Sequence, residues 1–194
     1  MFVTFEGVDG AGKSTLIAAL AERLRANGVR VLVTREPGDG EFGIAVRELL
    51  LDRHICPEAE LFLFLADRSE HVRNTVVPAL ERGETVLCDR YGDSTVVYQG
   101  FARGFDIEQL KELNRFATNN LVPDRTFILD LDPADAAKRR TKGDRLDREA
   151  EEFHQKVRDG FLSLAEAEPN RFTVLDATKP TDQLVELALE SWPN

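Results

Sequence analysis

Five short apolar runs recur along the chain, and longer segments with apolar residues at helical spacing separate them. The runs lie at residues 2–5, 29–33, 85–88, 126–131 and 172–175. Nearly every position in each run is apolar, which is typical of strands buried on both faces. The pattern therefore predicts an α/β fold, with a five-stranded parallel sheet and helices on both of its faces.

Glycine and proline mark where the predicted helices end. A helical pattern opens at Ser14 and continues to about Asn27, where Gly28 suits the position just after a helix. A longer helical region is predicted from about Glu58 to Arg82, and Pro78 should kink it or end a turn.

The stretch between the first run and the first helix fits the phosphate-binding pattern G-x-x-x-x-G-K-[ST]. It reads Gly7, Val8, Asp9, Gly10, Ala11, Gly12, Lys13, Ser14 and Thr15. The glycines let backbone N–H groups point at a polyphosphate, and the following helix adds its positive end. Lys13 should reach the β- and γ-phosphates, and the Ser14 hydroxyl should ligate Mg²⁺. This P-loop predicts binding of a nucleoside triphosphate.

Charged side chains follow four of the five predicted strands. They are Glu6, then Arg35 with Glu36, then Asp89 with Arg90, and finally Asp130 with Asp132. Ligands of open α/β sheets bind at this carboxyl edge of the strands. Asp89 suits the support of Mg²⁺, whereas Arg35 and Arg90 can each grip a phosphate through two parallel hydrogen bonds. Two arginines beyond the P-loop indicate a second phosphate, that of an acceptor.

Composition and charge narrow the class of protein. A chain of 194 residues with 42% apolar residues suits one domain over residues 1–194. The net charge of −10 argues against nucleic acid and anionic membranes as partners. The two cysteines and three histidines show no metal-ligand spacing, and no apolar run reaches 18 residues. The first strand begins at residue 2, which leaves no room for a signal peptide, so we expect a cytoplasmic protein.

One segment departs from the acidic background. Residues 138–148 hold six basic side chains against two acidic ones, a local charge of +4. On composition alone, such a run is most often a solvated face.

Four sequence blocks together resemble the thymidylate kinase family. They are residues 7–15, 34–38, 64–68 and 89–100, and their order and spacing are specific among nucleoside monophosphate kinases. The resemblance implies a P-loop kinase fold with a short lid at about residues 138–150. It also implies transfer of the γ-phosphoryl group of ATP to dTMP with Mg²⁺, giving ADP and dTDP, in a homodimer.

The resemblance also implies roles for individual side chains. Phe64 would stack on the thymine ring, and Arg68, one helical turn later, would hydrogen-bond its carbonyl edge. Arg90 would clamp the acceptor phosphate with Arg35 as its helper, and Asp9 would lie near the sugar 3′-hydroxyl and the metal. The remaining substrate-binding residues implied in this way are Glu36, Ser94, Tyr98 and Gln99, with Tyr98 excluding a 2′-hydroxyl.

Positive charge for the transferred group is expected to come from the lid. Some members of the family carry an arginine directly after the P-loop aspartate, but this chain has Gly10 there. The expected contributors are therefore Arg140, Lys142 and Arg145, with Arg139 against the adenine ring. Closing such a lid would exclude water and neutralise charge on the phosphoryl group. A further departure is the order Gly38-Asp39-Gly40-Glu41, which adds a carboxylate beside the presumed phosphate site.

Two alternatives stay open at this stage. One is a kinase for another nucleoside monophosphate or a deoxynucleoside, although the acceptor arginines argue against a substrate without phosphate. The other is a GTPase switch, because residues 89–92 fit its D-x-x-G pattern, but no N-K-x-D signature follows.

Overall fold

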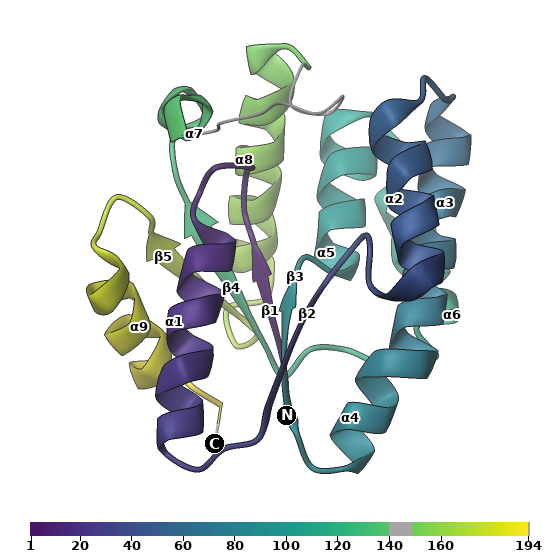
Figure 1. Ribbon diagram of the computed structural model, residues 1–194. Helices are drawn as coiled ribbons and strands as arrows, with labels where there is room; N and C mark the ends of the chain where they lie inside the picture. The colour runs from purple at the N-terminus through teal and green to yellow at the C-terminus, as the bar shows by residue number, and fades with distance from the viewer. Residues whose placement is uncertain (140–148, 194) are drawn as a thin grey trace.

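The computed structural model describes residues 1–139 and 149–193, which form a five-stranded parallel sheet between layers of helices (Figure 1). The strands are β1 (Phe2–Glu6), β2 (Val31–Arg35), β3 (Thr85–Asp89), β4 (Arg125–Asp130) and β5 (Phe172–Asp176). Their order in the sheet is β2-β3-β1-β4-β5, and each neighbouring pair is parallel. The predicted fold class is confirmed.

The helices follow the predicted alternation with the strands. They are α1 (Lys13–Ala26), α2 (Gly40–Asp52), α3 (Pro57–His71), α4 (Val77–Glu81), α5 (Gly92–Thr95), α6 (Ile107–Ala117), α7 (Pro133–Arg139), α8 (Glu151–Ala167) and α9 (Thr181–Glu190). Two π-helical turns, η1 (Val72–Val76) and η2 (Val96–Ala102), continue α3 and α5. Within the described part of the chain, no helix is long and apolar enough to cross a membrane.

The largest difference from the predicted strand boundaries is at the start of the second strand. β2 begins at residue 31, not 29, because Val29 N–H donates to Leu24 O at 3.0 Å and so belongs to the end of α1. Gly28 adopts a φ of 81° there, and its N–H donates to Arg25 O at 2.9 Å, which completes a Schellman-type helix end. The long helical region around Pro78 continues through η1 into α4, with the π-helical turn directly before the proline.

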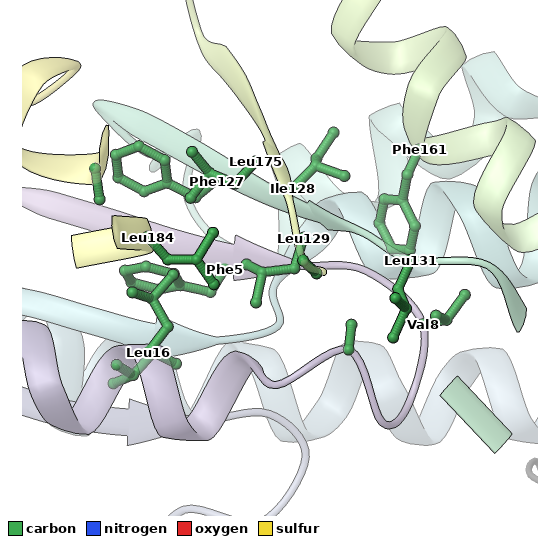
Figure 2. Packing of buried hydrophobic residues seen from close by; sticks show 14 of the residues in the cluster. Phe5, Val8, Leu16, Phe127, Ile128, Leu129, Leu131, Phe161, Leu175 and Leu184 are labelled. Atoms are coloured by element: carbon green, nitrogen blue, oxygen red, sulfur yellow. The ribbon is translucent and has the colours of Figure 1, made fainter. Parts of the chain in front are cut away.

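Helices cover both faces of the sheet (Figure 1). α1 and α9 pack on one face, where Phe5 of β1 lies with Leu16 and Leu184 (Figure 2). α8 covers part of the opposite face, and its Phe161 lies beside Leu131 (Figure 2). η1 and α4 cover the part of the sheet near β3.

The strand order positions the P-loop. In the sheet, β2 and β3 lie on one side of β1, and β4 and β5 lie on the other. Where connections lead to opposite sides in this way, open α/β sheets have a ligand crevice at the carboxyl edge of the strands. The loop after β1 runs close to β4. A Cβ atom added to Gly7 would lie only 2.5 Å from Leu129 O. Gly7 has a φ of 131°, which side-chain-bearing residues rarely adopt. Only glycine fits this approach.

Candidate active site

A cavity of about 560 Å³ lies at the carboxyl edge of the sheet. We call one flank the P-loop side, which consists of residues 10–16 with Arg139, Ala177, Lys179, Thr181 and Leu184. The other flank, the α3 side, consists of Arg35, Glu36, Pro37, Arg47, Leu51, Phe64, Arg68, Ser94, Thr95, Tyr98 and Gln99. Asp9, Asp89 and Arg90 line the cavity where the two sides meet.

Lys13 lies inside the curl of the P-loop. Its Nζ donates to Gly7 O and to Val8 O, each at 3.1 Å, and lies 4.0 Å from an Asp9 carboxylate oxygen. Burial lowers the pKa of Lys13, and the positive charge of Arg90 lowers it further. Gly7 and Val8 thus hold the lysine through their carbonyls and do not line the cavity.

Ser14 and Asp89 meet as the P-loop pattern and the end of β3 predict. Ser14 Oγ donates to Asp89 Oδ2 at 2.7 Å. Among the described residues, no three His, Cys, Asp or Glu side chains gather as a metal cage. Mg²⁺ in nucleotide sites is held by one or two oxygen ligands of the protein together with phosphates and water, and this hydroxyl and carboxylate fit that donor set.

Arg90, which lies where the two sides meet, donates hydrogen bonds to three other residues that line the cavity. Its Nη2 donates to Asp9 Oδ1 at 2.8 Å and to the Tyr98 hydroxyl at 3.0 Å, while Nη1 donates to Ser94 Oγ at 3.0 Å. These bonds use three of its five N–H groups, which leaves two without a partner in the described chain. Burial acts to lower the pKa of Arg90, but the charge of Asp9 raises it well above its usual value.

The backbone of Arg90 is also unusual. Its φ of 72° lies in the left-handed region, which costs a side-chain-bearing residue about 1–2 kcal/mol. The N–H of Arg90 donates to Phe5 O at 3.0 Å, and Cys88 Sγ donates to Arg90 O at 3.1 Å. Strain held in this way is common at functional sites.

Glu6 and Asp9 respond in opposite ways to the same arginine. Glu6 is fully buried and accepts hydrogen bonds from Tyr91 N, Ser94 N and Ser94 Oγ. Burial raises the pKa of Glu6 to about 7, although Arg90 opposes the shift. Burial also acts to raise the pKa of Asp9, but the charges of Arg90 and Lys13 lower it below its usual value.

Arg68 lies at the end of a buried ion-pair cluster. Its Nε donates to Glu36 Oε2 at 2.8 Å, and His71 Nδ1 lies 2.8 Å from Glu36 Oε1. The other Arg68 bonds go to Thr95 Oγ1, Asn114 Oδ1 and Tyr91 O, so four of its five N–H groups are used. Burial acts to lower the pKa of His71, but the bond to Glu36 raises it. Burial and the charge of Glu36 raise the pKa of nearby Asp67 to about 6.

The structure brings most of the sequence-predicted residues to this cavity. Phe64 and Arg68 both face it from α3, Tyr98 and Gln99 from η2, and the exposed Arg35 from the end of β2. Arg139 also lines the cavity and donates to Ala177 O at 3.1 Å. Arg140, Lys142 and Arg145 lie outside the described residues.

The charged end of β4 is paired away from the cavity, and the buried Glu6 at the end of β1 does not line it either. Arg158 of α8 donates to both oxygens of Asp130, at 2.6 and 3.0 Å, and reaches Asp132 at 3.5 Å. Neither aspartate lines the cavity. The extra carboxylate Asp39 is also turned away, because it accepts a hydrogen bond from Thr75 at 2.6 Å and does not line the cavity.

Some cavity residues have no counterpart in the sequence-based set. Lys179 and Thr181 follow β5, so the rule that ligands meet strand ends would have found them had it been applied to the fifth strand. Arg47 comes from the middle of α2, where it donates to Pro37 O at 2.8 Å. Its place in the sequence carries no signal of its own.

Comparison with known proteins agrees with this geometry. The family model described as thymidylate kinase matches residues 5–188. The thymidylate kinase of Deinococcus radiodurans is 51% identical over 95% of this chain and 92% of its own length, and that of Clavibacter michiganensis is 50% identical over 95% and 90%. The crystal structure of thymidylate kinase from Ehrlichia chaffeensis is similar with a TM-score of 0.80 and 36% identity, covering 98% of this chain and 96% of the other. These relatives give no support to the GTPase alternative, and the chain belongs to the thymidylate kinase family.

Proposed function

We propose that this protein transfers the γ-phosphoryl group of ATP to dTMP, giving ADP and dTDP. The observation that carries the proposal is that a P-loop and a second cationic flank line one cavity, with Arg90 where they meet. A triphosphate on the P-loop side and a monophosphate on the α3 side would then face each other across Asp9 and Arg90. Family membership supports dTMP as the acceptor.

Catalysis by this arrangement would rest on position and charge. The P-loop N–H groups would hold the β- and γ-phosphates, and Lys13 would place its ammonium beside them. Arg90 keeps one N–H on Nε and one on Nη1 without a partner in the described chain, and each can donate to the acceptor phosphate. Asp9 accepts from Nη2 of the same guanidinium, so the Arg90 side chain is already oriented before the acceptor binds.

Ser14 and Asp89 would hold Mg²⁺ in this proposal. The ion would neutralise charge that develops on the transferred group. The Ser14 hydroxyl already points at the carboxylate of Asp89, so both oxygens face the same place.

The α3 side would bind the thymidine part of dTMP. Phe64 offers a ring face for stacking, and Arg68 has one N–H left over for a base carbonyl. Tyr98 donates to Asp9 Oδ2 at 3.3 Å, which fixes its ring beside the position proposed for the sugar.

The proposal includes a single domain, a basic lid, a homodimer and a cytoplasmic location. Large apolar side chains are exposed on α2, α3 and α6, which pack side by side. They are Phe42, Ile44, Leu49, Phe62 and Phe116. A second copy of the chain that covered these side chains would remove them from water, which supports the homodimer.

Release of ADP in a coupled assay tests the proposal. With ATP and Mg²⁺, dTMP should be turned over in preference to dCMP, AMP, GMP and the nucleoside thymidine. Removing Mg²⁺ with EDTA should stop turnover, and adding it back should restore it. Comparable turnover of AMP would contradict the assignment of the acceptor.

A further inference from the structure

Helix α3 presents a buried carboxylate two turns before Arg68. Glu60 is 1% exposed, and together with Phe64 and Arg68 it follows a spacing of four residues that places the three on one helix face. A buried carboxylate is costly unless it is paired. Here Arg103 supplies the charge, because its Nε donates to Glu60 Oε1 at 2.9 Å and its Nη2 to Oε2 at 3.3 Å.

Arg103 is itself held from the other side. Its Nη2 donates to Glu149 Oε1 at 3.0 Å, and its guanidinium carbon lies 5.2 Å from the centre of the Phe153 ring. Arg103 follows η2 directly, whereas Phe153 belongs to α8. The guanidinium therefore has a fixed place from which it orients both oxygens of Glu60.

This arrangement sets the direction of the Gln99 side-chain amide. Gln99 Nε2 donates to Glu60 Oε1 at 2.9 Å. A carboxylate that already accepts from a guanidinium has no proton to give, so the amide must turn its nitrogen toward it. The amide oxygen of Gln99 consequently points elsewhere.

Within the described residues no hydrogen bond reaches the amide oxygen of Gln99, a residue that is 1% exposed and lines the cavity. Within residues 1–139 and 149–193, the buried side-chain atoms without a hydrogen-bond partner are Arg125 Nε and His154 Nε2. Gln99 Oε1 is not one of these two atoms, although it accepts no hydrogen bond there. It therefore keeps some accessible surface, and Gln99 lines the cavity. The α3 side thus offers a free acceptor from Gln99 and a free N–H from Arg68.

We infer that Glu60, held by Arg103, is a positioning residue that selects the acceptor base through the orientation of Gln99. This inference rests on the proposed function. A thymine or uracil ring shows a carbonyl acceptor at position 4 and an N–H donor at position 3, which match Arg68 and Gln99 Oε1. A cytosine ring shows an amino donor and a bare nitrogen acceptor at these positions, so both contacts become repulsive. Sites that bond a polar group in this way discriminate strongly, because a mismatch leaves buried groups unpaired.

The test is the Glu60→Gln variant, whose amide can either donate or accept. Gln99 would then be free to turn, so the ratio of kcat/KM for dTMP to that for dCMP should fall at least about tenfold. The loss for dTMP should come mainly from a higher KM, with the KM for ATP unchanged. The substrate dUMP should follow dTMP, because it has the same base edge. A merely structural lesion would lower kcat/KM for dTMP and dCMP together.

Two further variants sharpen this test. Glu58→Gln makes the same chemical change on an exposed position of α3, and its ratio should equal that of the parent. In the double variant Glu60→Gln/Gln99→Glu, residue 99 accepts from the new amide and still presents an oxygen to the base. This swap should restore much of the preference for dTMP, which loss of packing alone would not allow.

The outcomes separate the inference from the proposed function. If the parent shows no preference for dTMP, the proposed function is wrong. If the parent is selective and folded Glu60→Gln keeps its ratio within about twofold, the positioning role is wrong. Should Glu60→Gln fail to fold by circular dichroism, Arg103→Lys decides the matter, since it keeps the charge but loses the two-pronged contact. A lowered ratio in Arg103→Lys supports the inference, and an unchanged ratio overturns it.

Discussion

The P-loop side and the α3 side of the cavity hold their polar groups in opposite ways. On the P-loop side the chain offers backbone N–H groups, and the side chains of Ser14, Arg139 and Lys179 are exposed. On the α3 side Arg68 and Glu36 are buried, 2% and 4% exposed, and bond one another, although Arg35 at the rim is exposed.

The difference matches what each side would have to recognise. A triphosphate carries acceptor oxygens all around it, so a curled backbone and a helix N-terminus suffice to bind it. A base edge carries donors and acceptors in a fixed order, so the protein needs side chains whose direction is set before binding. Buried ion pairs on the α3 side supply that fixed direction. We therefore expect changes on the P-loop side to affect mainly kcat and changes on the α3 side to affect mainly binding of the acceptor.

The largest expected effect is that of Lys13→Ala on kcat. Loss of the ammonium removes positive charge from the transferring group, which should lower kcat about 10³-fold. Binding of dTMP, measured by isothermal titration, should stay within a few-fold, because the contacts of Lys13 within the described residues are with the P-loop, including Asp9. A kcat within tenfold of the parent would contradict the role of Lys13.

Arg90→Ala, in contrast to Lys13→Ala, should mainly weaken the binding of dTMP. Loss of charge-assisted hydrogen bonds from a buried site should weaken dTMP binding by about 3 kcal/mol, within the 2–5 kcal/mol typical of such losses. The rate should also fall, since Asp9 loses the guanidinium that pairs with its Oδ1. Arg35→Ala is the matched control, and its effect should be smaller because that side chain is exposed. If Arg90→Ala bound dTMP as tightly as the parent, Arg90 would not be the acceptor clamp.

Changes in the basic run at residues 138–148 should affect the rate of phosphoryl transfer but not the binding of the acceptor. Replacing Arg140, Lys142 and Arg145 together with Ala should lower kcat at least about a hundredfold, because a positioned cation stabilises the transferring group. The dissociation constant for dTMP should change by no more than a few-fold. Lys138→Ala is the control from the same basic run, since that residue is exposed and pairs with Asp135. A triple variant with near-parent kcat would mean that the segment is a solvated face.

The sequence predicts the sheet and the P-loop well for physical reasons. Buried parallel strands need apolar residues at nearly every position, so their runs are visible in the sequence. The P-loop needs specific residue types, such as a glycine where Leu129 O leaves no room for a Cβ. Both signals can be recognised from neighbouring residues in the sequence, although the close approach that requires Gly7 is made by the distant β4.

Other parts of the site could not be predicted from local signals. Asp89 and Asp130 both follow strands, but only Asp89 lines the cavity, because Arg158 from α8 binds Asp130. The partners of Arg68, which include Glu36 and Asn114, lie far apart in sequence. Burial that shifts the pKa of Glu6 likewise comes from packing of the whole fold and not from its neighbours in the chain.

Glu6 gives the smallest expected effect, and it concerns stability. Burial raises the pKa of Glu6 from 4.5 to about 7 in the folded state. The folded protein then binds a proton that the unfolded chain releases between these values. Its stabilising contribution is complete below pH 4.5 and is lost as the pH rises through 7.

Urea unfolding of the parent and of Glu6→Gln at a series of pH values measures this contribution. The Gln variant stands in for the protonated side chain, so the parent should lose about 2 kcal/mol relative to it between pH 5 and pH 7.5. Taking the difference between the two proteins removes the contribution of Asp67, whose pKa is raised to about 6 by burial and by Glu36. An exposed control such as Glu58→Gln should show no such dependence, because its carboxylate lies on the surface of α3. Parallel pH curves for the parent and Glu6→Gln would mean that Glu6 is ionised throughout this range, and that Arg90 rather than burial sets its charge.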